Sequence, residues 1–314
     1  MDLFLANVKT AGLQVAILYI LVAVGFIADK TGLYTQKTAK ATTNLLFYII
    51  TPMVIINSFL NMEFSSDSVK GLLISFGIAI MIHVVAIIIT IPFFNKKDDP
   101  DMGIYKFASV YGNVGYMALP LAQSVLGSEG VFYCSSGVIV FNILCFTQGA
   151  WEMTKNQEGH AKIGIKQVIL SPGLISVIIG LPFYLLSINL PEIITTPVEY
   201  IASLNTPLAM IILGTYIANT DLKTLFTVKE HYIVLALKQI ALPLIMILFF
   251  KLANIPDTIA VACSITAAAP PANNTVMFTA KYDKDIGKAS KMIAFGSIFS
   301  IITMPIIIAL AQNL

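Results

Sequence analysis

Long apolar stretches alternate with short polar turns along the whole chain. Each stretch contains about 20 mostly apolar residues, which is the length that a helix needs to cross the hydrocarbon core of a bilayer. The pattern predicts an all-α integral membrane protein with ten transmembrane helices and no separate soluble domain. The predicted spans are residues 11–28, 41–60, 69–93, 103–126, 130–151, 165–188, 193–218, 231–252, 257–280 and 288–312.

The composition agrees with this pattern. Of the 314 residues, 57% are hydrophobic and only 11% are charged, whereas soluble chains carry about 25% charged residues. The mean hydropathy is +0.84. These values exclude a soluble enzyme with a large core and identify the lipid bilayer as the surroundings of the protein. The net charge of +2 says little by itself; the expected partners are the bilayer and a small organic anion, with no nucleic acid.

The positive charges are distributed unevenly between the two sets of loops. All 19 basic residues are lysines; 15 lie in the odd-numbered loops, Lys9, Lys70 and Lys251 lie on the other side, and Lys238 lies inside the eighth span. Cytoplasmic loops carry the excess of positive residues. We therefore expect a multi-pass protein of the cell (plasma or inner) membrane with both termini outside. The N-terminus lacks the basic segment and cleavage site of a removable signal peptide.

The two halves of the chain resemble each other. Thr51-Pro52 in the second span recurs 155 positions later as Thr206-Pro207 in the seventh span, and two weaker matches, of Gly12-Leu13 with Gly173-Leu174 and of Pro120 with Pro270, keep the same order. This order predicts a five-helix unit used twice, over residues 1–155 and 156–314. Because five is odd, the second unit enters the membrane from the opposite side and the repeat is inverted. An unrepeated ten-helix bundle is the alternative.

Two apolar stretches contain residues that a membrane helix normally avoids. Gly112, Gly115 and Pro120 interrupt the fourth predicted span, and Pro270-Pro271 interrupts the ninth. Unpaired backbone groups in hydrocarbon cost several kcal/mol each, so such breaks persist only where protein, water or a ligand surrounds them. Paired interruptions in corresponding halves indicate the binding site of a transporter. We therefore expect broken helices four and nine that cross near the middle of the membrane.

The chemistry of the two breaks favours a small anion. Proline prefers the first turn of a helix, so we expect half-helices to begin at Pro120 and at Pro270-Pro271. Each helix N-terminus carries a partial positive charge and free N–H donors. Asn113, Asn273 and Asn274 can hold a carboxylate without adding a charge to the membrane interior. The alternative is that these asparagines only pair with backbone groups freed at the breaks.

Further polar residues in the spans extend the candidate site. The Tyr116 ring can close one side of an organic anion, Thr275 offers a hydroxyl, and Asn142 either faces the site or bonds to a neighbouring helix. Lys238 either extends its ammonium to the inner surface or lines the inner anion pathway. His83 has no second metal ligand near it, so we expect a packing residue or a proton carrier. The substrate-binding candidates are Asn113, Gly115, Tyr116, Pro120, Asn142, Lys238, Pro270, Pro271, Asn273, Asn274 and Thr275, with no metal and no cofactor.

Four stretches, residues 107–121, 171–174, 207–214 and 268–282, resemble the auxin efflux carrier family, which includes plant PIN carriers and bacterial malate and malonate permeases. The resemblance implies two inverted five-helix repeats, as in bile-acid/sodium symporters. It also implies a scaffold of helices 1, 2, 6 and 7, a mobile transport domain of helices 3–5 and 8–10, and a homodimer. Asn113 matches the family's substrate-binding asparagine, and Pro120 and Pro270 match its crossover prolines.

These observations predict a secondary transporter of small organic anions. The expected cargo is a carboxylate such as malate or malonate, or an auxin-like acid, moved by elevator-type alternating access. The alternative within transport is a sodium- or proton-coupled organic anion symporter of the bile-acid type. An intramembrane enzyme is not expected, because the spans contain no nucleophile with a base and no His-Glu-x-x-His motif. A receptor without flux is disfavoured by the repeat.

Overall fold

The computed structural model of the protein describes residues 2–94, 101–154, 165–220 and 222–314, and each of the ten predicted ranges falls mainly on helix. The first half of the chain contains α1 (Asp2–Lys30), α2 (Gln36–Leu45), η1 (Leu46–Ile50), α3 (Thr51–Leu60), α4 (Ser66–Thr90), α5 (Met102–Val110), η2 (Val114–Ala118), α6 (Leu119–Leu144), η3 (Cys145–Gly149) and α7 (Ala150–Thr154). The second half contains α8 (Ile165–Ile169), α9 (Pro172–Leu185), α10 (Glu192–Ser203), α11 (Asn205–Ala218), α12 (Leu222–Leu225), α13 (Lys229–Leu235), η4 (Ala236–Ala241), α14 (Leu242–Leu252), α15 (Asp257–Ala268), α16 (Asn274–Lys281) and α17 (Ile286–Ala311).

The helical segments have the length and composition of a multi-pass membrane protein. Within the described residues, seven segments are long and apolar enough to cross a bilayer, and α9 and α15 are shorter apolar helices. Large apolar side chains such as Ile20, Leu248 and Ile302 point outward and are about 60% exposed. An outer surface covered by such residues is stable in lipid but not in water. The chain is therefore an all-α protein embedded in a membrane.

The longest of these segments, Val114–Thr154, is not a single straight helix. Gly127 has φ 66° and ψ −154°, a conformation that only glycine adopts readily. The chain turns back there, so that α7 lies against α5; a methyl group on Gly103 of α5 would lie 3.0 Å from the Glu152 carbonyl oxygen. Gly127 thus forms the turn between the fourth and fifth predicted spans.

The segments η1 to η4 are π-helical turns, which are one residue wider than a turn of α-helix. Three of these four turns stand directly before a proline. η1 leads into Thr51-Pro52, η2 into Leu119-Pro120, and η4 into Leu242-Pro243. A proline inside a helix has no N–H to donate, and its ring clashes with the carbonyl group four residues earlier. A turn widened by one residue separates the ring from that carbonyl and lets the helix continue.

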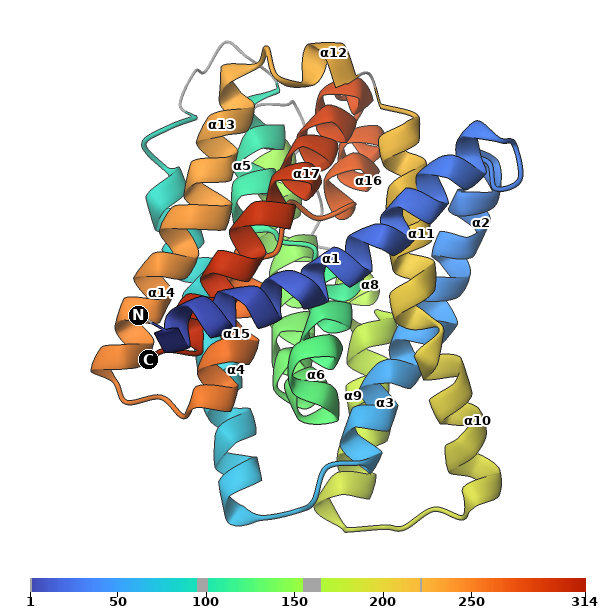
Figure 1. Cartoon of the computed structure of the whole chain (residues 1–314), viewed down its shortest axis with the longest axis vertical. Coiled ribbons are helices and arrows are strands. Elements are labelled where there is room, and N and C mark those ends of the chain that lie inside the picture. The colour runs from blue at the N-terminus through green and yellow to red at the C-terminus, as the bar shows by residue number, and fades with distance from the viewer. Residues whose placement is uncertain (1, 95–100, 155–164, 221) are drawn as a thin grey trace.

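Two close contacts fix one flank of the molecule, where Figure 1 shows α2, α3, α9, α10 and α11 together. Helices α1 and α11 cross at Gly25 and Gly214, where an added methyl group would overlap the facing backbone of Ile211 or Val22. The Thr51 hydroxyl donates to Asn205 Oδ1 at 3.1 Å and joins α3 to α11. Helix α6, which continues the fourth predicted span, packs against α3, α9 and α11 of this flank.

Replacing Gly127 tests the turn. We expect Gly127→Ala to destabilise the folded protein by about 1–3 kcal/mol, because alanine is strained at this φ and ψ. The measurement is the thermal stability of the purified protein in detergent. Gly77→Ala is the matched control: Gly77 is an exposed helical glycine of α4 with open space around the added methyl, so this variant should be equally or slightly more stable. Equal stability of the two variants would contradict the assignment of the turn.

Candidate functional site

Both predicted interruptions are present, and they lie against each other. Helix α5 ends at Val110 and α15 ends at Ala268, and each is followed by extended backbone. The Asn113 N–H donates to the Pro270 carbonyl oxygen at 2.7 Å, and the Ala272 N–H donates to the Tyr111 carbonyl oxygen at 2.9 Å. This short antiparallel pairing, centred on Gly112 and Pro271, satisfies backbone groups that would otherwise be unpaired in an apolar interior.

The half-helices begin at asparagines rather than at prolines. Asn113 precedes η2, and its side-chain oxygen accepts a hydrogen bond from the Tyr116 N–H at 3.2 Å; Asn273 precedes α16. The expected starts at Pro120 and at Pro270-Pro271 are therefore wrong. Pro120 lies within the helix that continues from η2, and the proline pair lies in the extended stretch. An asparagine side chain can accept from a free N–H of the first turn, which proline cannot do.

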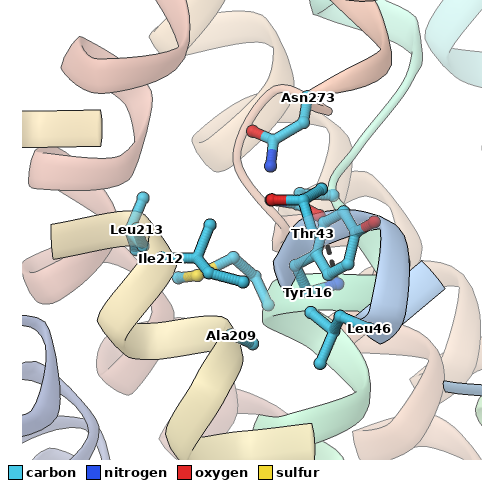
Figure 2. Close-up of a pocket in the computed structure, with 9 residues that line it drawn as sticks. Thr43, Leu46, Tyr116, Ala209, Ile212, Leu213 and Asn273 are labelled. Atoms are coloured by element: carbon cyan, nitrogen blue, oxygen red, sulfur yellow. Dashed lines mark hydrogen bonds between the residues drawn. The ribbon is translucent and has the colours of Figure 1, made fainter. Parts of the chain in front are cut away.

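A small pocket lies on one side of this crossover. It is lined by nine residues and has a free volume of about 10 Å³, which is room for roughly one water molecule. Figure 2 shows Thr43, Tyr116 and Asn273 grouped on one side and the α11 side chains on the other. None of the lining residues carries a charge. The lining residues are Thr43, Leu46, Asn113, Tyr116, Met117, Ala209, Ile212, Leu213 and Asn273.

Two amide side chains supply donors to this pocket. Asn113 is 4% exposed, and because its oxygen accepts from Tyr116 N–H, its NH₂ group is directed away from the helix start. No side-chain hydrogen bond joins Asn273 to another residue in the described ranges, and Figure 2 shows its side chain extending toward Thr43 and Tyr116. The pocket therefore offers neutral N–H donors beside two helix N-termini, an arrangement that suits a small anion.

A second small cavity lies on the opposite face of the crossover, lined by Lys238, His83, Gly112 and Thr266 among others. Lys238 is only 1% exposed, so its ammonium does not extend to the membrane surface. Its Nζ lies 2.9 Å from the position of a methyl group added to Gly112. His83 Nδ1 bonds to the Ala79 carbonyl oxygen at 2.8 Å. Because neighbouring residues of an extended chain point to opposite sides, Asn113 faces the first pocket while Gly112 faces Lys238.

The other candidates lie outside both cavities. Asn142 Nδ2 donates to the Val138 carbonyl oxygen at 2.8 Å and packs near Gly173 of α9. Asn274 Nδ2 points to Cys145 Sγ at 3.8 Å, and Thr275 is fully buried. The remaining candidates, Gly115, Pro120, Pro270 and Pro271, belong to the backbone of the crossover and the helices that leave it. Among the described residues, no cluster of three His, Cys, Asp or Glu side chains suits a metal ion.

Sequence reasoning missed the wall of the first pocket that comes from distant helices. Thr43 and Leu46 lie at the junction of α2 and η1, and Ala209, Ile212 and Leu213 lie on α11. These residue types are common in any membrane helix, so their identity contains no signal. The recurring Thr-Pro pairs, Thr51-Pro52 and Thr206-Pro207, do lie on the same two apolar segments, Gln36–Leu60 and Glu192–Ala218. They could have indicated that these segments meet.

The apolar helices and the paired helix breaks define a multi-pass membrane protein with a small polar site where the two broken helices meet. The chain belongs to the family described as “Membrane transport protein”, which it matches over residues 11–167 and 161–308. This confirms the resemblance to the auxin efflux carrier family. The protein is accordingly a membrane transporter and not an enzyme.

Two relatives show how far the similarity extends. The chain is 25% identical over 299 residues to “Uncharacterized transporter MJ1031” of Methanocaldococcus jannaschii, which covers 92% of this chain and 95% of the relative. It is 25% identical over 205 residues to a protein of Rhizobium meliloti named “Putative malonate transporter”, which covers 63% of each chain.

Replacing Gly112 tests the close approach of Lys238 to the crossover. We expect Gly112→Ala to lower the stability by about 1–3 kcal/mol, as an extra carbon does in a packed interior. The same substitution in a Lys238→Ala background should cost less, because the nearest side-chain atoms have been removed; the Ala269 carbonyl oxygen, 3.0 Å away, remains. Thermal unfolding in detergent measures both differences.

Gly115→Ala is the matched control for this prediction, because an added methyl there has no neighbour within 4 Å. We expect its stability to stay within about 0.5 kcal/mol of the starting protein. If the penalty at Gly112 were the same with and without the Lys238 side chain, the two residues would not be in contact.

Proposed function

We propose that the protein is a secondary transporter of small organic anions, and that it binds the carboxylate of its cargo in the first pocket at the crossover. The observation that supports this most directly is the position of Asn113 and Asn273, whose amides face one pocket at the starts of two half-helices. The name of the Rhizobium meliloti relative adds support for a carboxylate such as malonate. Malate and auxin-like acids have the same charged group and remain within this proposal.

The proposed binding energy comes from neutral donors and from one cation that lies behind the backbone of the crossover. Amide N–H groups and helix N-termini bind a carboxylate without forming an ion pair. Lys238 lies behind the backbone of the crossover, on the face opposite the pocket. In its protonated form the ammonium attracts the anion without contacting it, and this attraction is strong because little water screens it in an apolar interior. The cargo is held firmly but can still leave.

The same pocket suggests how access alternates. Thr43, Leu46 and the α11 residues come from helices assigned above to the scaffold, whereas Asn113, Tyr116, Met117 and Asn273 come from the proposed transport domain. We infer that ten helices form two inverted five-helix units, residues 1–155 and 156–314. Movement of the transport domain along the smooth apolar wall of Ala209, Ile212 and Leu213 would carry the bound anion across the membrane.

Three further features belong to this proposal. We place the protein in the cell membrane with both termini outside, as the lysine distribution indicates, and we propose a homodimer formed by the scaffold helices. A membrane potential contributes about 2.3 kcal/mol per charge per 100 mV. A potential that is negative inside favours anion exit, so uptake requires exchange or a coupled cation. Sodium or proton coupling, as in bile-acid symporters, predicts that removing the ion gradient abolishes net uptake.

The decisive experiment is uptake of labelled malonate into proteoliposomes. We expect Asn113→Ala to lower uptake at a subsaturating concentration about ten-fold or more, because a hydrogen bond to a charged group is worth about 1.5–3 kcal/mol. Asn142→Ala is the matched control: it also removes a buried asparagine, but one whose amide donates to a backbone carbonyl far from the pocket. Undiminished uptake by the Asn113 variant would remove this site from the mechanism.

A second measurement isolates the contribution of Lys238. We expect Lys238→Met to raise the half-saturating malonate concentration by about ten-fold, since the charge that attracts the anion is lost while the apolar stem remains. Lys251→Met removes an exposed lysine at the end of α14 and should change this concentration less than two-fold. Equal effects of the two variants would show that Lys238 contributes only general charge.

A further inference from the structure

Thr43 of α2 lines the pocket and has a hydroxyl group, in addition to the two asparagine amides at the crossover. Its Oγ1 donates to the Ala39 carbonyl oxygen at 2.7 Å, one helical turn earlier, and lies 3.0 Å from the Tyr216 hydroxyl. A carbonyl oxygen can only accept, so the single proton of the Thr43 hydroxyl is used in the bond to Ala39. Tyr216 must therefore be the donor in the second bond.

This arrangement leaves Thr43 as an acceptor toward the pocket. A hydroxyl oxygen has two lone pairs, and the bond from Tyr216 occupies one of them. Neither of the two bonds uses the other lone pair, and Thr43 is one of the residues that line the cavity. A carboxylate has no proton to offer to this oxygen. A hydroxyl group on the cargo can donate its proton to this oxygen. The polar side of the pocket therefore contains two amide donors and one hydroxyl acceptor.

We propose that Thr43 makes the pocket prefer hydroxycarboxylates to the same acids without the hydroxyl, which it still carries; this inference rests on the carboxylate transport proposed above. The carboxylate takes the amide protons of Asn113 and Asn273, and the hydroxyl of the cargo donates to Thr43 Oγ1. A site built to pair with a substrate hydroxyl rejects the analogue that lacks it, because a buried polar group is then left unpaired.

Lactate and propionate provide the matched pair of probes, because both have three carbons and one carboxylate and differ by one hydroxyl. The experiment measures how well each unlabelled acid competes with labelled lactate for uptake into proteoliposomes. For the unmodified protein we expect lactate to compete about ten-fold better than propionate, the size expected for one buried hydrogen bond. Thr43→Val, which has nearly the same shape but no hydroxyl, should reduce this ratio to about two-fold or less.

The ratio within each variant cancels differences in expression and folding. Thr42→Val is the matched control, because Thr42 is the neighbouring residue, makes the same kind of bond to the Thr38 carbonyl at 3.1 Å, and does not line the pocket. It should keep the ratio of the unmodified protein. A ratio near one in the unmodified protein, or a ratio that Thr43→Val leaves unchanged, would overturn the role of Thr43.

Failure of the broader proposal would look different. If Asn113→Ala transported both acids as well as the unmodified protein, the crossover would not be the carboxylate site, and the assignment of Thr43 would fail with it. If uptake of both acids depended on Asn113 but the ratio did not depend on Thr43, the proposed function would stand and only this inference would be wrong.

Discussion

The fold depends on one requirement, that backbone N–H and C=O groups in an apolar interior must find partners. Two helices are broken within the interior, and each leaves several such groups free. The structure places the breaks together, so that Asn113 and Ala272 donate across to the carbonyl groups of Pro270 and Tyr111. Neither break is stable alone in lipid, because each supplies the hydrogen-bond partners of the other. Backbone pairing therefore holds the two broken helices together where they cross, in addition to the packing of buried side chains such as Phe107 and Phe278.

The same requirement explains why the polar site lies at this point. A helix that restarts inside the protein has free N–H groups in its first turn, and Asn113 caps one of these starts with its side-chain oxygen. The cap uses the acceptor end of the amide and leaves the donor end to face the pocket. A residue that stabilises the fold thereby also supplies a donor of the proposed binding site. Structure and proposed function share one side chain, so neither can change without the other.

Much of this architecture could be predicted from the sequence, because the signals are local. Apolar length predicted the helical ranges, and Gly112, Pro120 and Pro270-Pro271 marked the two breaks. The predicted starts of the half-helices were wrong: the Asn113 side chain caps the first one, and the second begins after Asn273, beyond the extended stretch that contains the two prolines. Thr43 and the α11 wall were not predicted, because they reach the pocket through packing between helices distant in sequence. The buried position of Lys238 likewise depends on the absence of a side chain at Gly112, which no local pattern reveals.

The glycine at position 112 has a consequence for how such a protein can diversify. With no side chain there, the strand that separates Lys238 from the pocket is a single peptide thick. In the proposed mechanism, the electrostatic attraction of the anion comes from Lys238 behind this backbone. The residues on the pocket side recognise the shape and the hydrogen-bonding groups of the cargo. Selectivity can be retuned by exchanging residues such as Thr43 or Ala209 without weakening the underlying attraction. Proteins with this fold can thus bind different acids when only the residues that line the pocket differ.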